Sequence, residues 1–146
     1  MIRFSKMADY GVLLLGHLAR QDGISASASE MADATHMPRP VVANLLKSFR
    51  EAGLLDSRRG LHGGYWMVRT PDEISLLDVL SAVDGPVQLT DCAVADLATQ
   101  CDYEDVCLSR SPMKNVHDRI VELLRSTTLR ELMTTVPTPT LPASSS

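Results

Sequence analysis

The stretch LLDSRRGLHGGYWMVR, residues 54–69, holds two short segments of alternating apolar and polar character around a glycine-rich centre. Alternation with a period of two is typical of half-buried strands, because successive side chains of a strand point to opposite faces. Gly60, Gly63 and Gly64 suit a tight turn between the two segments. We therefore predict a β-hairpin with a glycine tip.

Three helices are predicted before this hairpin. Apolar residues recur there at three- and four-residue steps, which favours amphipathic helices. Ser27 and Glu30 have the spacing of a capping box, in which each side chain satisfies a backbone donor of the other residue. The expected helices run from a cap at Ser5 to Gly23, from Ser27 to about Thr35, and from Pro40 to Gly53.

Further helices are predicted after the hairpin. Their start signals are Ser75 with Asp78, Ser111 with Pro112, and Thr128 with Glu131. The first of these helices is expected to stop at Gly85 and Pro86. The second is long and carries apolar residues on one side: Met113, Val116, Ile120, Leu123 and Leu124. We expect this side to pack against a second copy of the chain.

The order of three helices and a basic hairpin is typical of a winged helix-turn-helix, whose third helix enters the major groove of DNA and whose hairpin is the wing. The predicted fold class is mainly α with a small β-hairpin wing, a winged helix-turn-helix plus a long dimerisation helix. We expect a DNA-binding domain at residues 1–70, a ligand-bearing loop and dimerisation helices at residues 71–134, and a disordered tail at residues 135–146.

Composition and charge agree with this division. The 146 residues carry a net charge of −4, but residues 1–70 hold nine Lys and Arg against six acidic residues, whereas the remainder holds five against twelve. A basic front part suits a polyanionic partner, with uneven surface charge as the ordinary alternative. An aromatic content of 4% excludes a base-stacking RNA module. The apolar stretch at residues 12–18 is too short for a membrane span, so we expect a cytoplasmic protein that does not associate with membranes.

The predicted fold indicates which residues contact DNA. The outward residues expected on the third helix are Arg39, Val41, Ala43, Asn44, Lys47 and Ser48. Asn44 is the candidate for reading a base, and Lys47 and Arg50 are candidates for phosphate contacts. In the wing, Arg58 or Arg59 is expected to enter a minor groove with help from His62. For each charged residue, the ordinary alternative is a solvated surface charge.

The three cysteines lie in one short acidic segment with the spacing Cys92-x8-Cys101-x5-Cys107. Three soft ligands in one loop suit an iron–sulfur cluster or zinc better than a hard cation, although three ordinary reduced thiols would also fit. A thiol redox enzyme is disfavoured, because no Cys-x-x-Cys is present and neighbouring carboxylates oppose thiolate formation.

The chain resembles the IscR and NsrR type of iron–sulfur transcription regulators, the Rrf-two superfamily, from Arg3 to Met133. The residues that carry the resemblance are Ser5-Lys6, Asp9-Tyr10, Arg59-Gly60-Leu61-His62-Gly63-Gly64-Tyr65, Ile74-Ser75-Leu76 and the three cysteines. Within the family, the chain is most similar to regulators of the SUF iron–sulfur assembly operon, through Ala8-Asp9-Tyr10-Gly11, the wing and the run Gly85-Pro86-Val87-Gln88-Leu89-Thr90.

The resemblance implies a homodimer with crossed long helices that binds operator DNA and an iron–sulfur cluster. It implies ligation by Cys92, Cys101 and Cys107, completed by Asp9 of the partner subunit. In the IscR branch, the fourth ligand is a histidine three residues after the last cysteine, but Arg110 occupies that position here and cannot ligate. His117, Glu104 and Asp105 are alternatives, although His117 is expected on the polar side of the long helix. Three Cys and one Asp favour [4Fe-4S] over [2Fe-2S].

The function implied by the resemblance is a repressor of iron–sulfur assembly (SUF) genes that catalyses no reaction. The alternatives are a zinc-binding winged-helix regulator and a nitric-oxide- or iron-responsive repressor of the same family. Ala43 stands where IscR has a glutamate that restricts which operators are read, so the operators of IscR do not carry over to this chain.

Overall fold

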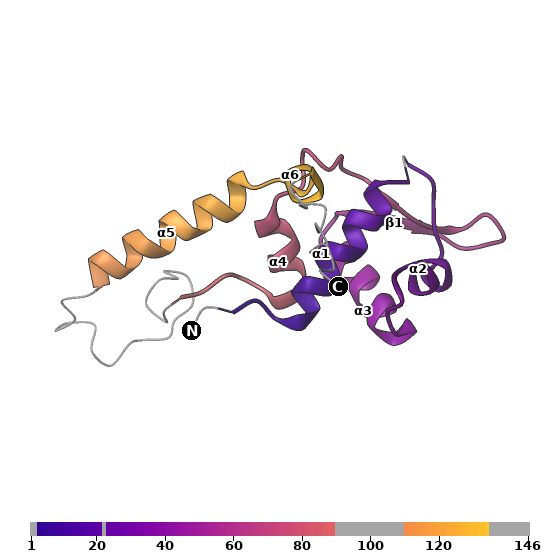
Figure 1. Ribbon diagram of the computed structural model, residues 1–146, viewed down its shortest axis with the longest axis horizontal. Coiled ribbons are helices and arrows are strands. Elements are labelled where there is room, and N and C mark those ends of the chain that lie inside the picture. Colours follow the sequence, from indigo (N-terminus) through magenta and orange to yellow (C-terminus); the bar gives the residue numbers. More distant parts are fainter. Residues whose placement is uncertain (1–2, 22, 90–109, 135–146) are drawn as a thin grey trace, which may run out of the picture.

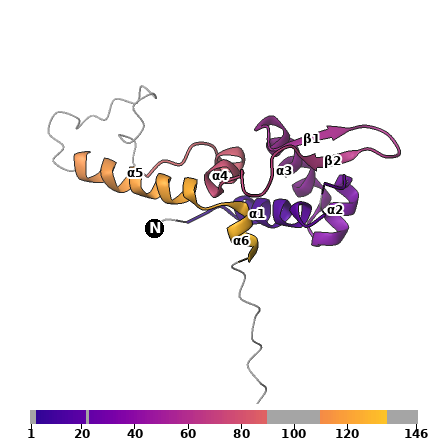
Figure 2. The same cartoon turned by 90° about the horizontal axis from the view of Figure 1, so that it is seen from above.

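Figure 1 shows the computed structural model of the chain, which describes residues 3–21, 23–89 and 110–134. Within these residues, the elements are α1 (Lys6–Ala19), α2 (Ala28–Thr35), α3 (Arg39–Glu51), β1 (Leu55–Arg58), β2 (Gly64–Met67), α4 (Leu76–Asp84), α5 (Arg110–Ser126) and α6 (Leu129–Thr134). The predicted fold class, mainly α with one small hairpin, is confirmed. The hairpin and α5 extend from opposite ends of the helical core (Figures 1 and 2).

Three helices begin with the capping boxes that the sequence predicts. At α2, the Ser27 backbone N–H donates to the Glu30 carboxylate at 2.7 Å, and the Glu30 N–H donates to Ser27 Oγ at 3.1 Å. Ser75 and Asp78 form the same reciprocal pair at α4, and Thr128 and Glu131 form it at α6. Each box satisfies two backbone donors that a helix leaves free at its N-terminus.

Helix α1 begins as predicted and ends earlier than predicted. Ser5 Oγ accepts from the Ala8 N–H at 3.0 Å and donates to the Asp84 carboxylate at 2.7 Å, which joins the start of α1 to the end of α4. The helix ends at Ala19, and the N–H of the next residue, Arg20, donates a hydrogen bond to the His17 carbonyl at 3.2 Å. The prediction of Gly23 as its end is wrong, because Gly23 lies in the following turn, with φ of 80°.

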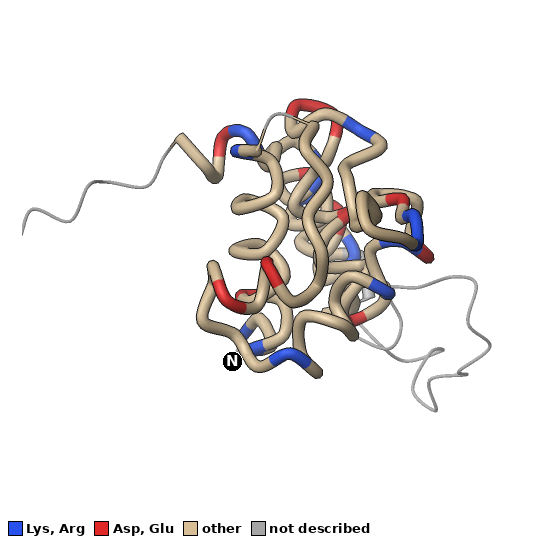
Figure 3. Tube along the Cα trace, turned by 90° about the vertical axis from the view of Figure 1, so that its right-hand side faces the viewer, with Lys and Arg blue, Asp and Glu red and all other residues tan. Residues whose placement is uncertain are grey.

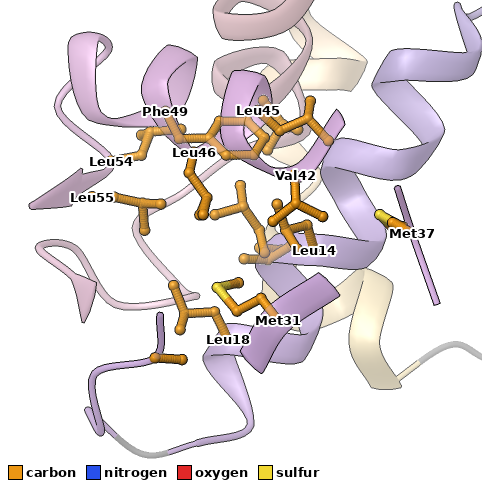
Figure 4. Close-up of a cluster of buried hydrophobic side chains, with 14 of the residues drawn as sticks. Leu14, Leu18, Met31, Met37, Val42, Leu45, Leu46, Phe49, Leu54 and Leu55 are labelled. Carbon is orange, nitrogen blue, oxygen red and sulfur yellow. The ribbon is translucent and has the colours of Figure 1, made fainter. Parts of the chain in front are cut away.

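One aliphatic core holds α1, α2, α3 and the hairpin together (Figure 4). Its labelled side chains are Leu14, Leu18, Met31, Met37, Val42, Leu45, Leu46, Phe49, Leu54 and Leu55. Helix α6 adds Leu129, which is fully buried. Gly11 lets α1 approach α3 and α4, because a Cβ there would lie 2.9 Å from Phe49 Cζ and 3.2 Å from Val83 Cγ2.

Backbone hydrogen bonds join the hairpin to the linker between α1 and α2. Its antiparallel register pairs Leu55 with Met67 at one end and Arg58 with Gly64 at the other. Ala26 of the linker exchanges two backbone hydrogen bonds with Tyr65, at 3.0 and 2.8 Å. A side chain at Gly64 would collide with Ala26, since a Cβ would lie 2.8 Å from the Ala26 carbonyl oxygen. The glycine therefore permits the contact that fixes the wing relative to the helices.

Helix α5 packs on α4 and leaves part of its apolar surface exposed. Leu124 is buried in a small cluster with Leu80 of α4 and Ala8 of α1. The helix begins at Arg110, so the prediction of Ser111 as its N-cap is wrong, although Pro112 lies in the first turn as predicted. The prediction that His117 lies on a polar side is also wrong, because its side chain is buried and its Nδ1 has no hydrogen-bond partner among the described residues. Ile120 and Leu124, which are four residues apart, pack in this cluster, and that is a helical spacing.

Candidate nucleic-acid interface

Helix α3 has one buried face and one exposed polar face. Val42, Leu45, Leu46 and Phe49 face the core and have at most 1% of their surface exposed. The predicted DNA contacts on this helix are all exposed: Arg39, Asn44, Lys47 and Arg50. Ala43 is exposed beside them, whereas Val41 and Ser48, also expected to point outward, are half-buried, and Val41 packs against the core. The exposed residues recur every three to four positions, so they form one stripe along the helix.

The turn between α2 and α3 fixes the direction of this stripe. Helix α2 ends at Thr35, and its C-cap residue His36 adopts a left-handed conformation with φ of 57°. Met37 is buried, and Pro38 precedes the first residue of α3. Arg39 lies 4.0 Å from Asp33 of α2, and both side chains are largely exposed. An exposed pair at this distance contributes little stability, so Arg39 remains available to another anion.

The hairpin presents the other predicted DNA contacts. Arg58 ends β1, and the exposed side chains of Arg59 and His62 follow it in the turn. The Gly63 N–H donates to the Gly60 carbonyl at 3.0 Å and closes the turn. A Cβ at Gly63 would lie only 2.2 Å from the Arg58 carbonyl oxygen, so no other residue fits without displacing the backbone.

The hairpin also presents residues that sequence reasoning did not assign. Leu61 is fully exposed at the tip, next to Arg59 and His62. Arg58, His62 and Trp66 line a hollow together with Gly23 and Ser25 of the linker between α1 and α2. Ser25 and Trp66 are distant in sequence and are brought together by the pairing of Ala26 with Tyr65. No local sequence pattern predicts this pairing. Figure 3 faces this end of the molecule, where basic positions are interspersed with acidic ones.

The predicted metal ligands fall only partly within the described residues. Asp9 lies in the first turn of α1, and its exposed carboxylate has no hydrogen-bond or ion-pair partner in the part of the chain that the structure describes. Cys92, Cys101 and Cys107 lie outside the described residues, as do the alternatives Glu104 and Asp105. Among residues 3–21, 23–89 and 110–134, no group of three His, Cys, Asp or Glu side chains could hold a metal ion.

A family model described as an iron-dependent transcriptional regulator, Rrf2, matches residues 4–135. The chain belongs to the Rrf2 family. The resemblance predicted from the sequence is thus confirmed, and this Rrf2 protein is a DNA-binding transcriptional regulator rather than an enzyme. No helix in the described ranges has the length and apolar character needed to cross a membrane.

Relatives of known name agree with this assignment. An HTH-type transcriptional regulator of Synechocystis, slr0846, is 30% identical over 132 residues, which are 90% of this chain and 87% of the relative. IscR of Pectobacterium atrosepticum is 32% identical over 123 residues, 84% of this chain and 65% of IscR.

Solved structures share the fold. CymR, described as the global cysteine regulator of Bacillus subtilis, superposes with a TM-score of 0.69 at 25% identity and covers 94% of this chain and 100% of its own. IscR of T. potens gives a TM-score of 0.66 at 25% identity, covering 91% of this chain and 87% of its own.

Proposed function

We propose that this Rrf2 regulator is a homodimeric, cytoplasmic repressor of iron–sulfur assembly (SUF) genes that senses an iron–sulfur cluster. The observation that carries its DNA-binding role is the exposed stripe of α3, with Asn44 and Lys47, on the same domain as a wing that presents Arg58 and Arg59. Asn44 reads a base in the major groove, while Lys47 and Arg50 contact phosphates. Arg39 adds a further phosphate contact, and Arg59, with Arg58 and His62, enters the minor groove.

The exposed side of α5 supports the homodimer. Val116 and Leu123 have 46% and 64% of their surface exposed and lie seven residues apart, on one side of the helix. Burying such side chains against the same helix of a second copy removes apolar surface from water. The chain then divides as the sequence suggests, into a DNA-binding domain at residues 1–70, a cluster-binding and dimerisation part at residues 71–134, and a tail at residues 135–146.

The donor set fits an iron–sulfur cluster. Cys92, Cys101 and Cys107 supply three thiolates, and the exposed carboxylate of Asp9, which has no partner among the described residues, is available to complete the cluster of a partner subunit. Three Cys and one Asp favour [4Fe-4S], with [2Fe-2S] as the alternative. A bound cluster supplies redox-sensitive iron whose loss or oxidation changes which protein ligands are held.

Asp9 would couple the cluster to DNA binding. It lies on α1, whose Leu14, Leu15 and Leu18 pack in the same core as α3. A cluster that binds Asp9 of the partner subunit therefore contacts the rigid unit that carries the DNA-reading helix. This gives the cluster a differential interaction between two orientations of that unit, which a shift in population requires.

The names of the relatives are also compatible with other effectors. The family description names iron, and CymR is described as a cysteine regulator. A zinc-binding winged-helix regulator uses the same three cysteines with Asp or His, and a repressor that responds to nitric oxide or iron retains the cluster. Zinc yields colourless protein with stoichiometric metal, which separates the first of these alternatives from the proposal.

The test is DNA affinity as a function of cluster occupancy. A duplex selected from a random library by the cluster-loaded protein is titrated with loaded protein, cluster-free protein and the Asp9→Ala variant. We expect the loaded and cluster-free forms to differ in affinity and Asp9→Ala to lose this difference. Asp72→Ala, which removes an exposed carboxylate paired with Arg130, is the matched control and should retain it. Equal affinity of the loaded and cluster-free wild type would contradict the proposed sensing mechanism.

A further inference from the structure

A hollow of about 310 Å³ opens between α1, α6 and the turn that joins α2 to α3. This volume lies at the lower end of the range for small-molecule sites, which is about 300–1,000 Å³. Most of its lining is apolar and includes Val12, Leu13, Met37, Leu129, Leu132 and Met133. The side chain of Leu13 is 62% exposed in this chain, so the hollow presents apolar surface to solvent.

Gly16 keeps this hollow open. Glycine inside a helix is destabilising relative to alanine, so its presence normally has a packing or backbone reason. Gly16 lies within α1 without a positive φ, and a Cβ there would meet only Met133 Cγ, at an ordinary distance of 3.8 Å. Gly11 of the same helix is different, because a Cβ there would collide with Phe49. No contact among the described residues therefore requires Gly16 to be glycine, and its missing side chain leaves room for an occupant.

The polar groups of the hollow favour an anion. His17 in the last turn of α1 and Arg20 at its C-cap both line the hollow, and no acidic residue among those described lines it. Gln21 Nε2 lies 3.1 Å from His17 Nε2, which leaves Nδ1 as the ring nitrogen that this contact does not use. Arg20 is exposed and has no ion-pair partner among the described residues.

We propose that this hollow binds a small monocarboxylate with an apolar body. The carboxylate is held by Arg20 and His17, and the apolar body lies against the leucines and methionines of α1 and α6. Thr35 and Met37 bring the same hollow to the turn that precedes α3, so an occupant contacts the segment that orients the DNA-reading helix. The inference is independent of the cluster.

Methionine-methyl NMR of the full-length protein tests the proposal, with hexanoate as the probe and its neutral isostere hexanamide as the comparison. Met37 and Met133 line the hollow, and Met31 lies in the core as an internal reference. We expect saturable shifts of the Met37 and Met133 methyl signals with hexanoate, no shift at Met31, and at least tenfold weaker binding of hexanamide.

Two variants and one control sharpen this test. Gly16→Leu fills the hollow and should abolish the response while the Met31 signal stays in place, and Arg20→Gln should equalise hexanoate and hexanamide. Arg125→Gln, which removes an exposed cation of α5, should change nothing. Equal binding of the two probes by the wild type, or an unchanged response in Gly16→Leu, would overturn the proposal.

The same signals identify another occupant. If the Met37 and Met133 methyl shifts change with protein concentration but not on addition of hexanoate, the hollow is occupied by a second copy of the chain. A hexanoate response that occurs only in Leu141→Asp would assign it to the C-terminal segment of the chain. Either result would overturn the proposal that the wild-type hollow binds a small carboxylate.

Discussion

Gly63→Ala tests whether the geometry of the wing supports DNA binding. The new Cβ would lie 2.2 Å from the Arg58 carbonyl oxygen and 2.9 Å from the Arg59 carbonyl carbon. Both are backbone atoms, and an ordinary contact begins at 3.4 Å, so the two arms of the hairpin must separate by about 1.2 Å. This movement opens the hairpin at the Arg58–Gly64 pair, from which the basic residues of the wing extend.

The expected cost has a stability part and a binding part. Steric overpacking costs about 1–3 kcal/mol, which lowers the Tm of a chain of this size by about 2–12 °C. Each phosphate contact contributes about 0.9 to the slope of log K against log salt concentration. Displacing Arg58 and Arg59 in both protomers of the proposed homodimer removes up to four contacts, so the slope should fall by about 2–4 units.

The assay combines calorimetry with fluorescence anisotropy of a random-sequence duplex between about 50 and 200 mM salt. Gly16→Ala is the matched control, because its Cβ meets only Met133 at 3.8 Å. It should raise stability by about 0.5–1 kcal/mol and leave the salt slope unchanged. A Gly63→Ala protein that keeps both the wild-type affinity and the wild-type slope would refute a contact between the wing and DNA.

Four other substitutions are expected to have distinct effects. Lys47→Ala should weaken binding to selected and random duplexes alike and lower the salt slope by about one unit per contact. Asn44→Ala should instead relax the base preference at one position by about 1–3 kcal/mol, with little change in the salt slope. Competition titrations with single-base variants of the duplex measure the effects of both substitutions. Ser27→Ala removes one half of the α2 capping box and should lower the free energy of unfolding by about 0.5–2 kcal/mol in urea titrations, and an unchanged midpoint would contradict the role of the box. Phe49→Ala empties a fully buried position and should cost about 3–5 kcal/mol, measured in the same way.

Local signals in the sequence predicted the fold well. The capping boxes at Ser27, Ser75 and Thr128 form as predicted, because each depends on side chains only three residues apart. The hairpin and the exposed stripe of α3 are also confirmed, since both follow from periodicity. The roles of individual residues in DNA binding stay predictions that the exposure of their side chains supports.

Long-range contacts explain the errors. His117 is buried although its helix carries many polar residues, and the sequence of α5 alone does not indicate which side faces α4. Helix α1 ends before Gly23 because the N–H of its C-cap residue, Arg20, donates to the carbonyl of His17. The linker that follows then pairs with the hairpin at Ala26. The hollow at Gly16 combines residues from both ends of the chain, so no sequence window reveals it.

The most direct test of the proposed cluster is an anaerobic visible spectrum of freshly purified protein, with iron and sulfide quantified per chain, for the wild type, Cys101→Ala and Asp9→Ala. We predict brown wild-type protein with an iron count that favours four over two per cluster, loss of the visible bands in Cys101→Ala, and an altered or labile cluster in Asp9→Ala. Colourless wild-type protein that holds stoichiometric zinc and does not incorporate iron and sulfide on reconstitution would contradict the account.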